Sequence, residues 1–192
     1  APMTLIDSHC HLDVADFAAD REAVLARCAA GGIGAIIVPG VRCADFAAQR
    51  AVCASSPLLH AAYGLHPVYL DDHAPGDLDL LRDWLARERP VAVGEIGLDW
   101  FIEDLDRARQ QALFEDQLAL AKEFDLPVIL HVRRSHDAVL ATLRRHRLPR
   151  GGICHAFNAS QAQADIFTGM GLRLGFGGAM SFDRALQIRR LA

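Results

Sequence analysis

Residues 107–131 have the sequence RARQQALFEDQLALAKEFDLPVILH, and this stretch decides the fold. Between Arg107 and Phe124, apolar side chains recur at intervals of three and four with charged residues between them, which predicts an amphipathic helix. The following run, Val128–His131, is short and almost continuously apolar, as is typical of a strand buried on both faces of a parallel sheet. The stretch therefore predicts one helix followed by one buried strand.

The same unit recurs along the whole chain at intervals of roughly 30 residues. Arg21–Ala30 and His136–Arg147 are further amphipathic stretches, and glycines follow several of the expected helices where helices commonly end. Alternation of this kind favours parallel strands joined by right-handed crossovers. The expected strands are Thr4–Asp7, Ala35–Pro39, His60–Gly64, Val91–Glu95, Val128–His131, Gly152–His155 and Leu172–Phe176.

Two α/β architectures are compatible with this number of strands. A TIM-type (β/α)8 barrel has eight strands over about 250 residues, whereas a doubly wound sheet has about five to seven. No G-x-G-x-x-G dinucleotide motif follows the first expected strand. We therefore expect residues 1–192 to form a single barrel domain that lacks the eighth strand and the C-terminal helix, with an intact seven-stranded sheet as the alternative. From the size of complete barrels, we expect the natural chain to continue for roughly 60 residues.

The composition is that of an ordinary soluble domain, with 52% hydrophobic and 23% charged residues. The net charge of -4 gives no general attraction to nucleic acid or to an anionic membrane, although a local basic pocket can still hold a phosphate. No stretch approaches the roughly 20 apolar residues that span a bilayer, and the N-terminus lacks the features of a secretory signal. We expect a cytoplasmic protein with no membrane partner and no obligatory protein partner.

The first expected strand runs into the sequence Asp7-Ser-His-Cys-His11. Because alternate residues of a strand point to the same face, we expect Asp7, His9 and His11 to project together. Two imidazoles at this spacing can chelate one metal ion, but histidines two residues apart occur by chance in many proteins. The pair alone therefore leaves a structural role open.

Three further expected strands end in a residue that can bind a metal, namely Glu95, His131 and His155. The C-terminal ends of barrel strands meet at one rim, which carries the chemistry of such enzymes. A polar group at the end of an apolar strand is costly unless it is paired or ligated. Repetition of this feature on four strands predicts a single site with the metal ligands His9, His11, Glu95, His131 and His155.

This set of imidazole and carboxylate ligands suits zinc, manganese or iron, and magnesium less well, because magnesium prefers oxygen ligands. The set is larger than a single catalytic zinc usually needs, so we expect one or two divalent ions with Glu95 between them. A bridging carboxylated lysine is not expected, since Lys122 is the only lysine and lies in a predicted helix. The five cysteines form no C-x-x-C pair, which argues against a zinc ribbon.

These residues together resemble the TatD family of metal-dependent hydrolases, within the amidohydrolase-like barrels. The resemblance implies that His9 and His11 bind a first ion, that His131 and His155 bind a second, and that Glu95 bridges the two. The family also has a catalytic aspartate in a late Glu-Thr-Asp-Ala-Pro stretch, so we expect the main acid/base residue beyond residue 192. The matching segments follow the order of the family and are Ile6–Leu12, Gly64–Pro67, Val93–Asp99, Pro127–Arg133 and His155–Phe157.

The expected reaction is metal-dependent hydrolysis of a phosphodiester, and the resemblance suggests a deoxyribonuclease that acts on DNA. Glu95 and His66 are the expected catalytic residues, and His66 and Arg133 the expected contacts to a substrate phosphate. Asp99 either orients a metal ligand from behind or caps a loop. Two alternatives remain: hydrolysis of a lactone, an amide or a small phosphoester, and a barrel that binds metal without catalysis.

Overall fold

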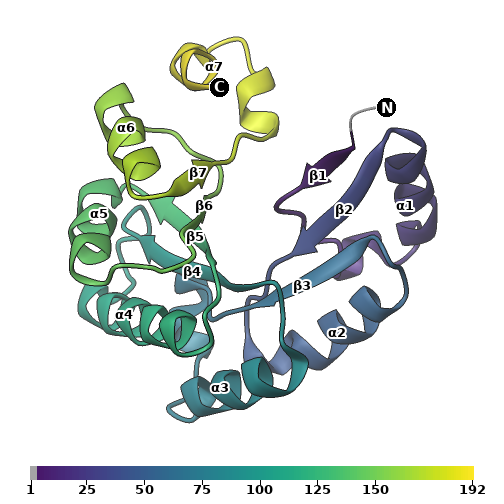
Figure 1. The fold of residues 1–192 in the computed structure, drawn as a ribbon, viewed down its shortest axis with the longest axis horizontal. Helices are drawn as coiled ribbons and strands as arrows, with labels where there is room; N and C mark the ends of the chain where they lie inside the picture. The colour runs from purple at the N-terminus through teal and green to yellow at the C-terminus, as the bar shows by residue number, and fades with distance from the viewer. Residues whose placement is uncertain (1–3) are drawn as a thin grey trace.

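One curled sheet of seven parallel strands, in the order β1-β2-β3-β4-β5-β6-β7, organises the computed structural model, which describes residues 4–192 (Figure 1). The strands are β1 (Leu5–Asp7), β2 (Ile33–Val38), β3 (Leu59–Tyr63), β4 (Ala92–Asp99), β5 (Val128–Arg133), β6 (Gly152–Cys154) and β7 (Leu172–Leu174). The helices are α1 (Arg21–Ala30), α2 (Phe46–Ala54), α3 (Asp77–Glu88), α4 (Arg107–Glu123), α5 (His136–Arg145), α6 (Gln161–Gly169) and α7 (Leu186–Leu191). Short 3-10 turns occupy Ala15–Phe17, Cys43–Asp45, Pro67–Asp72 and Gly178–Ser181.

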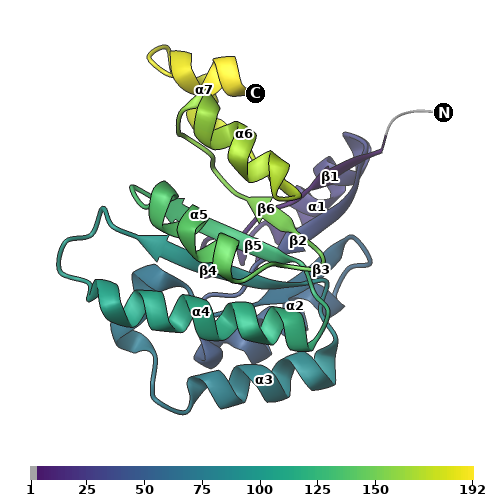
Figure 2. The ribbon, with the colours of Figure 1, turned by 60° about the vertical axis from the view of Figure 1, so that its left-hand side comes forward.

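The strand order decides between the two expected architectures. A doubly wound sheet reverses its order at a switch point and carries helices on both faces. Here each strand pairs in parallel with the next strand of the sequence, and the order never reverses. The sheet curls into part of a barrel with its helices on the outside (Figures 1 and 2), which confirms the barrel-type fold and rejects the doubly wound sheet. Within residues 4–192, β1 pairs only with β2, and β7 pairs only with β6.

The strand β4 is longer than the sequence pattern predicts, and this changes the position of Glu95. The expected strand ended at Glu95, but pairing with β5 continues to Asp99, which lies opposite Arg133. A register shift between Gly94 and Ile96 leaves Glu95 outside the ladder, as a bulge that re-aims its side chain. The prediction that Glu95 and His131 end their strands was therefore wrong, because pairing between β4 and β5 carries both strands beyond them.

The segment that follows β1 also differs from its expected form. The strand ends at Asp7, so His9 and His11 lie in the following loop and are not alternate residues of a strand. The loop is held locally: the Asp7 carboxylate accepts the His9 backbone N–H at 3.0 Å, and the Cys10 N–H donates to the Ile37 carbonyl at 3.0 Å. Hydrogen bonds of the loop, rather than strand alternation, place these two histidines.

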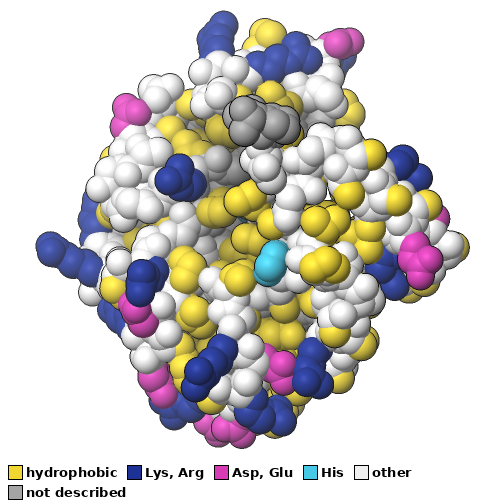
Figure 3. Space-filling model, turned by 45° about the vertical axis from the view of Figure 1, so that its right-hand side comes forward, with side chains coloured by type: hydrophobic (Ala, Val, Ile, Leu, Met, Phe, Trp, Pro, Cys, Tyr) yellow, Lys and Arg dark blue, Asp and Glu magenta, His cyan; other side chains and the backbone are white. Residues whose placement is uncertain are grey.

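The apolar core is divided by the sheet. Outside it, the inner face of α4 packs on β4 and β5 through Phe114, Leu118 and Ala121, in agreement with the predicted periodicity. Inside it, four neighbouring strands contribute a smaller apolar cluster of Ile37, Ala62, Ala92 and Ile129. Apolar side chains also gather on the face shown in Figure 3. Leu5 and Ile6 of β1 are among the exposed apolar residues. Every helix within residues 4–192 is too short or too polar to cross a membrane.

We expect the substitution Gly97→Ala to lower the free energy of unfolding by about 2 kcal/mol or more. Gly97 lies in β4 with φ 145°, and a β-carbon there would collide with the backbone carbonyl of His131. Urea denaturation followed by circular dichroism measures the loss. The matched control is Gly177→Ala, because an added β-carbon at Gly177 meets no heavy atom within 4 Å and φ there is -134°. Equal losses in the two variants would contradict the packing argument.

Candidate metal centre

The carboxylate of Glu95 lies among five imidazoles, and only 1% of the Glu95 side chain is exposed. The fold thus brings all the expected metal ligands together, although they come from four separate parts of the chain. It also brings in His66, which the sequence predicted as a substrate contact. The five histidines are His9, His11, His66, His131 and His155.

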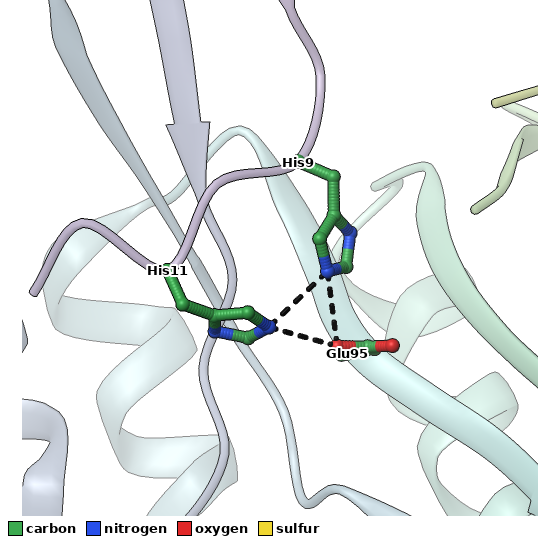
Figure 4. Close-up of side chains that lie close together, drawn as sticks. All are labelled: His9, His11 and Glu95. Carbon is green, nitrogen blue, oxygen red and sulfur yellow. Dashed lines mark hydrogen bonds and ion pairs between the residues drawn. The ribbon is translucent and has the colours of Figure 1, made fainter. Parts of the chain in front are cut away.

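One oxygen of Glu95 forms a triangle with the first two histidines (Figure 4). Each pair among Glu95 Oε2, His9 Nε2 and His11 Nε2 is separated by 3.2 Å. A tetrahedral zinc ion with bonds of about 2.0 Å separates its ligand atoms by roughly 3.3 Å. The triangle therefore has the size of one face of a tetrahedral metal site, and its donors are the nitrogen and oxygen atoms that such ions prefer.

The other oxygen of Glu95 faces different histidines. Oε1 lies 3.1 Å from His131 Nδ1 and 3.5 Å from His155 Nε2. The ring of His155 stacks on that of His9, with centroids 3.6 Å apart, so the two groups of ligands are in direct contact. The two carboxylate oxygens thus face different imidazoles, as in a carboxylate that bridges two ions, although the second group whose ligand atoms lie within 4.8 Å of one another is His66, Glu95 and His131.

The hydrogen bonds of His66 set it apart from the other histidines. Its Nδ1 accepts the backbone N–H of Val68 at 3.1 Å, so the proton of the neutral ring lies on Nε2, which is 3.4 Å from Glu95 Oε2. Burial lowers the pKa of His66 and favours this neutral form. The backbone carbonyl of His66 is hydrogen-bonded to His73 Nε2 at 2.9 Å. His66 therefore offers an N–H donor to the site, whereas a metal ligand needs a free lone pair.

Asp99 forms hydrogen bonds that fit both of the roles that the sequence left open. Its side chain is fully buried, and Oδ2 accepts a hydrogen bond from His131 Nε2 at 2.8 Å. Its Oδ1 accepts the backbone N–H groups of Phe101 and Ile102 at 3.0 and 3.2 Å, which closes the loop after β4. In the neutral form of His131 that metal binding requires, this hydrogen bond keeps the proton on Nε2 and leaves the Nδ1 lone pair on the side of Glu95.

Burial and hydrogen bonding act in opposite directions on the charges of this cluster. Burial raises the pKa of Glu95, but hydrogen bonds from His11, His131 and the other histidines outweigh it and hold that pKa well below its usual range. Burial lowers the pKa of His155 to about 4. Burial also lowers the pKa of His131, yet its hydrogen bonds with Asp99 and Glu95 prevail and raise it to about 9. An ionised Glu95 and a neutral His155 are the protonation states that metal binding requires, whereas His131 has a proton to release.

Comparison with known proteins identifies the family of this chain. A family model described as TatD-related DNase matches residues 6–192. The chain belongs to the TatD-related DNase family. The fold and the family resemblance inferred from the sequence are thereby confirmed, as is the prediction of a metal-dependent hydrolase at the level of the family.

Among its TatD-family relatives is the uncharacterized metal-dependent hydrolase YjjV of Escherichia coli K12, 46% identical over 186 residues, which cover 96% of this chain and 72% of YjjV. The crystal structure of YjjV superposes with a TM-score of 0.93 over 97% of this chain and 73% of that chain. A protein of Pantoea sp. (strain At-9b) named 3'-5' ssDNA/RNA exonuclease TatD is 30% identical over 191 residues, covering 97% of this chain and 73% of that protein.

Two buried glutamines of this TatD-family chain support the site from α4, and sequence reasoning missed them. Gln110 accepts the backbone N–H of Asp99 at 2.8 Å and donates to its carbonyl at 2.9 Å. Gln117 accepts the backbone N–H of Leu65, next to His66, at 2.7 Å. The available signal was their spacing, because polar residues seven positions apart on the apolar face of a helix are expected to have buried partners.

We expect Asp99→Asn to weaken divalent-metal binding by about 10- to 100-fold, because an amide no longer enforces the His131 tautomer that frees Nδ1. Isothermal titration of Zn²⁺ or Mn²⁺ into chelator-treated protein measures the change. Asp79→Asn on α3 is the control, since Asp79 is exposed and outside the cluster. Unchanged affinity in folded Asp99→Asn would show that this hydrogen bond does not prepare His131 for metal binding.

Proposed function

We propose that the protein is a metal-dependent phosphodiesterase that hydrolyses DNA, with a single strand as the substrate that best fits its relatives. The observation that carries the proposal is the pair of oxygens of the buried Glu95, each directed to its own histidines at 3.1 to 3.5 Å. The name of the Pantoea relative, a 3'-5' ssDNA/RNA exonuclease, supports the choice of nucleic acid.

In this proposal His9, His11 and Glu95 would hold one ion, and His131, His155 and Glu95 would hold the other. Zinc, manganese and iron suit this donor set, and magnesium suits it less well. When bound, such ions lower the pKa of a water molecule and stabilise the charge that develops on the phosphate.

The protein's own groups orient the substrate. His66 donates its Nε2 proton to a non-bridging oxygen, and Arg133 provides a guanidinium for the substrate backbone. Glu95 is surrounded by imidazoles and Asp99 is occupied by His131, so neither carboxylate is free to take a proton from water. The general base in this proposal is the aspartate that the resemblance to the TatD family implies.

We expect Glu95→Gln to abolish metal-dependent shortening of a single-stranded DNA oligonucleotide, with a loss of at least about 100-fold. The amide keeps the shape of Glu95 but removes the negative charge that both groups of ligands share. Electrophoresis of a labelled oligonucleotide, with Mg²⁺, Mn²⁺, Zn²⁺ or chelator, gives the rate. Glu22→Gln, an exposed position on α1, removes the same charge at a distance and serves as the control.

The same assay separates the alternatives. Hydrolysis of lactones or small phosphoesters, with no action on DNA and full dependence on Glu95, would replace the nuclease with a small-molecule hydrolase. Tight metal binding with no hydrolysis of any of these substrates would support a non-catalytic metal-binding barrel. Chelator-insensitive cleavage of DNA would contradict the proposed chemistry.

A further inference from the structure

A cavity of about 340 Å³ opens beside the candidate metal centre. The wall of this cavity includes His131 and His155, the two histidines that face Glu95 Oε1. The cavity therefore lies next to the Oε1 side of the metal centre. Beyond them lie Phe101, which is 44% exposed, and two consecutive arginines, Arg133 and Arg134.

The two guanidinium groups are held on one aromatic ring. Arg133 Cζ lies 3.7 Å and Arg134 Cζ 4.9 Å from the ring centroid of Phe101. Side chains of consecutive residues point to opposite faces of an extended strand. Arg134 adopts a left-handed conformation with φ 52° directly after β5, which turns the chain and allows both side chains to reach the same ring.

This pair of positive charges has no acidic partner in the part of the chain that the structure describes. The ion pairs within 4.0 Å that residues 4–192 form through arginine use Arg42, Arg50, Arg82, Arg109, Arg145 and Arg150. Two adjacent guanidiniums repel each other, and contact with a ring face offsets only part of that repulsion. An anion with several oxygens that binds between the two guanidinium groups neutralises their positive charge and removes the repulsion.

We infer that Arg133 and Arg134 form a second phosphate subsite, which holds the phosphate next to the one that is cleaved. The inference rests on the proposed function and narrows its substrate to a strand with at least two phosphates. A strand that leaves the centre past His131 and His155 enters this cavity, where the guanidinium forks bind backbone oxygens of any sequence. With a net charge of -4, the protein needs such a local subsite to retain a polyanion.

The test compares two substrates of the double variant Arg133→Gln/Arg134→Gln. One is a single-stranded DNA oligonucleotide, and the other is bis(p-nitrophenyl) phosphate, which has one phosphodiester and no second phosphate. We expect the ratio of kcat/KM for the oligonucleotide to kcat/KM for the small diester to fall about tenfold or more, mainly through KM. The salt dependence of oligonucleotide binding should weaken by about 0.7 in logarithmic slope for each phosphate that the variant fails to neutralise.

The control is Arg144→Gln/Arg147→Gln, which removes the same charge from the wall of a different cavity. If the kcat/KM ratio falls equally in this control, the fall is due to the loss of overall positive charge and the inference is overturned. An equal loss on both substrates in the first variant would place the arginines at the reacting phosphate and also overturn it. Arg133→Lys/Arg134→Lys keeps the charge without the planar fork and should recover only part of the ratio.

Binding measured without turnover separates this inference from the proposed function. Fluorescence anisotropy of a labelled oligonucleotide is recorded with Zn²⁺ for the unaltered protein and for the double variant. If oligonucleotide binding depends on the arginine pair but the protein cleaves no phosphodiester, the proposed function is contradicted and the subsite is supported. If the protein cleaves DNA but the double variant binds the oligonucleotide as well as the unaltered protein does, the proposed function is supported and the subsite is contradicted.

Discussion

The burial of one carboxylate is the constraint on which the rest of this structure depends. An ionised carboxylate in an apolar interior is costly unless charges or hydrogen bonds replace the water that it loses. Glu95, 1% exposed, receives that compensation from imidazoles on β5, on the loops after β1 and β6, and before the turn Pro67–Asp72. Each of these segments must therefore occupy its place before the centre can form.

Support for the centre extends outward in steps. Asp99 accepts a hydrogen bond from His131, and Gln110 on α4 is hydrogen-bonded to the backbone of Asp99. A helix on the outside of the barrel is thereby connected to the imidazole of His131. Gln117, two turns further along the same helix, holds the backbone beside His66. Rigid strands and buried amides keep the functional groups in position, as the narrow geometry of metal chemistry requires.

Sequence reasoning succeeded where the physics is local. The periodicity of residues 107–131 predicted α4 and β5, and the recurrence of that unit predicted a parallel barrel. It failed where pairing overrides local preference: β4 continues past Glu95 because β5 provides partners as far as Asp99, and His9 and His11 converge through a loop. The expected ligands nevertheless met, because the ends of parallel strands share one rim whatever the detail of each end.

The sequence by itself determined the fold class and the chemical types at the rim, since periodicity and side-chain identity are properties of neighbouring residues. Only the tertiary structure decided which oxygen of Glu95 faces which imidazole and which nitrogens of His66 and His131 face Val68 and Asp99. It also decided that Arg133 and Arg134 share the ring of Phe101. The physical reason is separation along the chain: His11 and Glu95 are 84 residues apart, and His131 and Asp99 are 32 apart. Contacts at such separations depend on how the whole sheet curls.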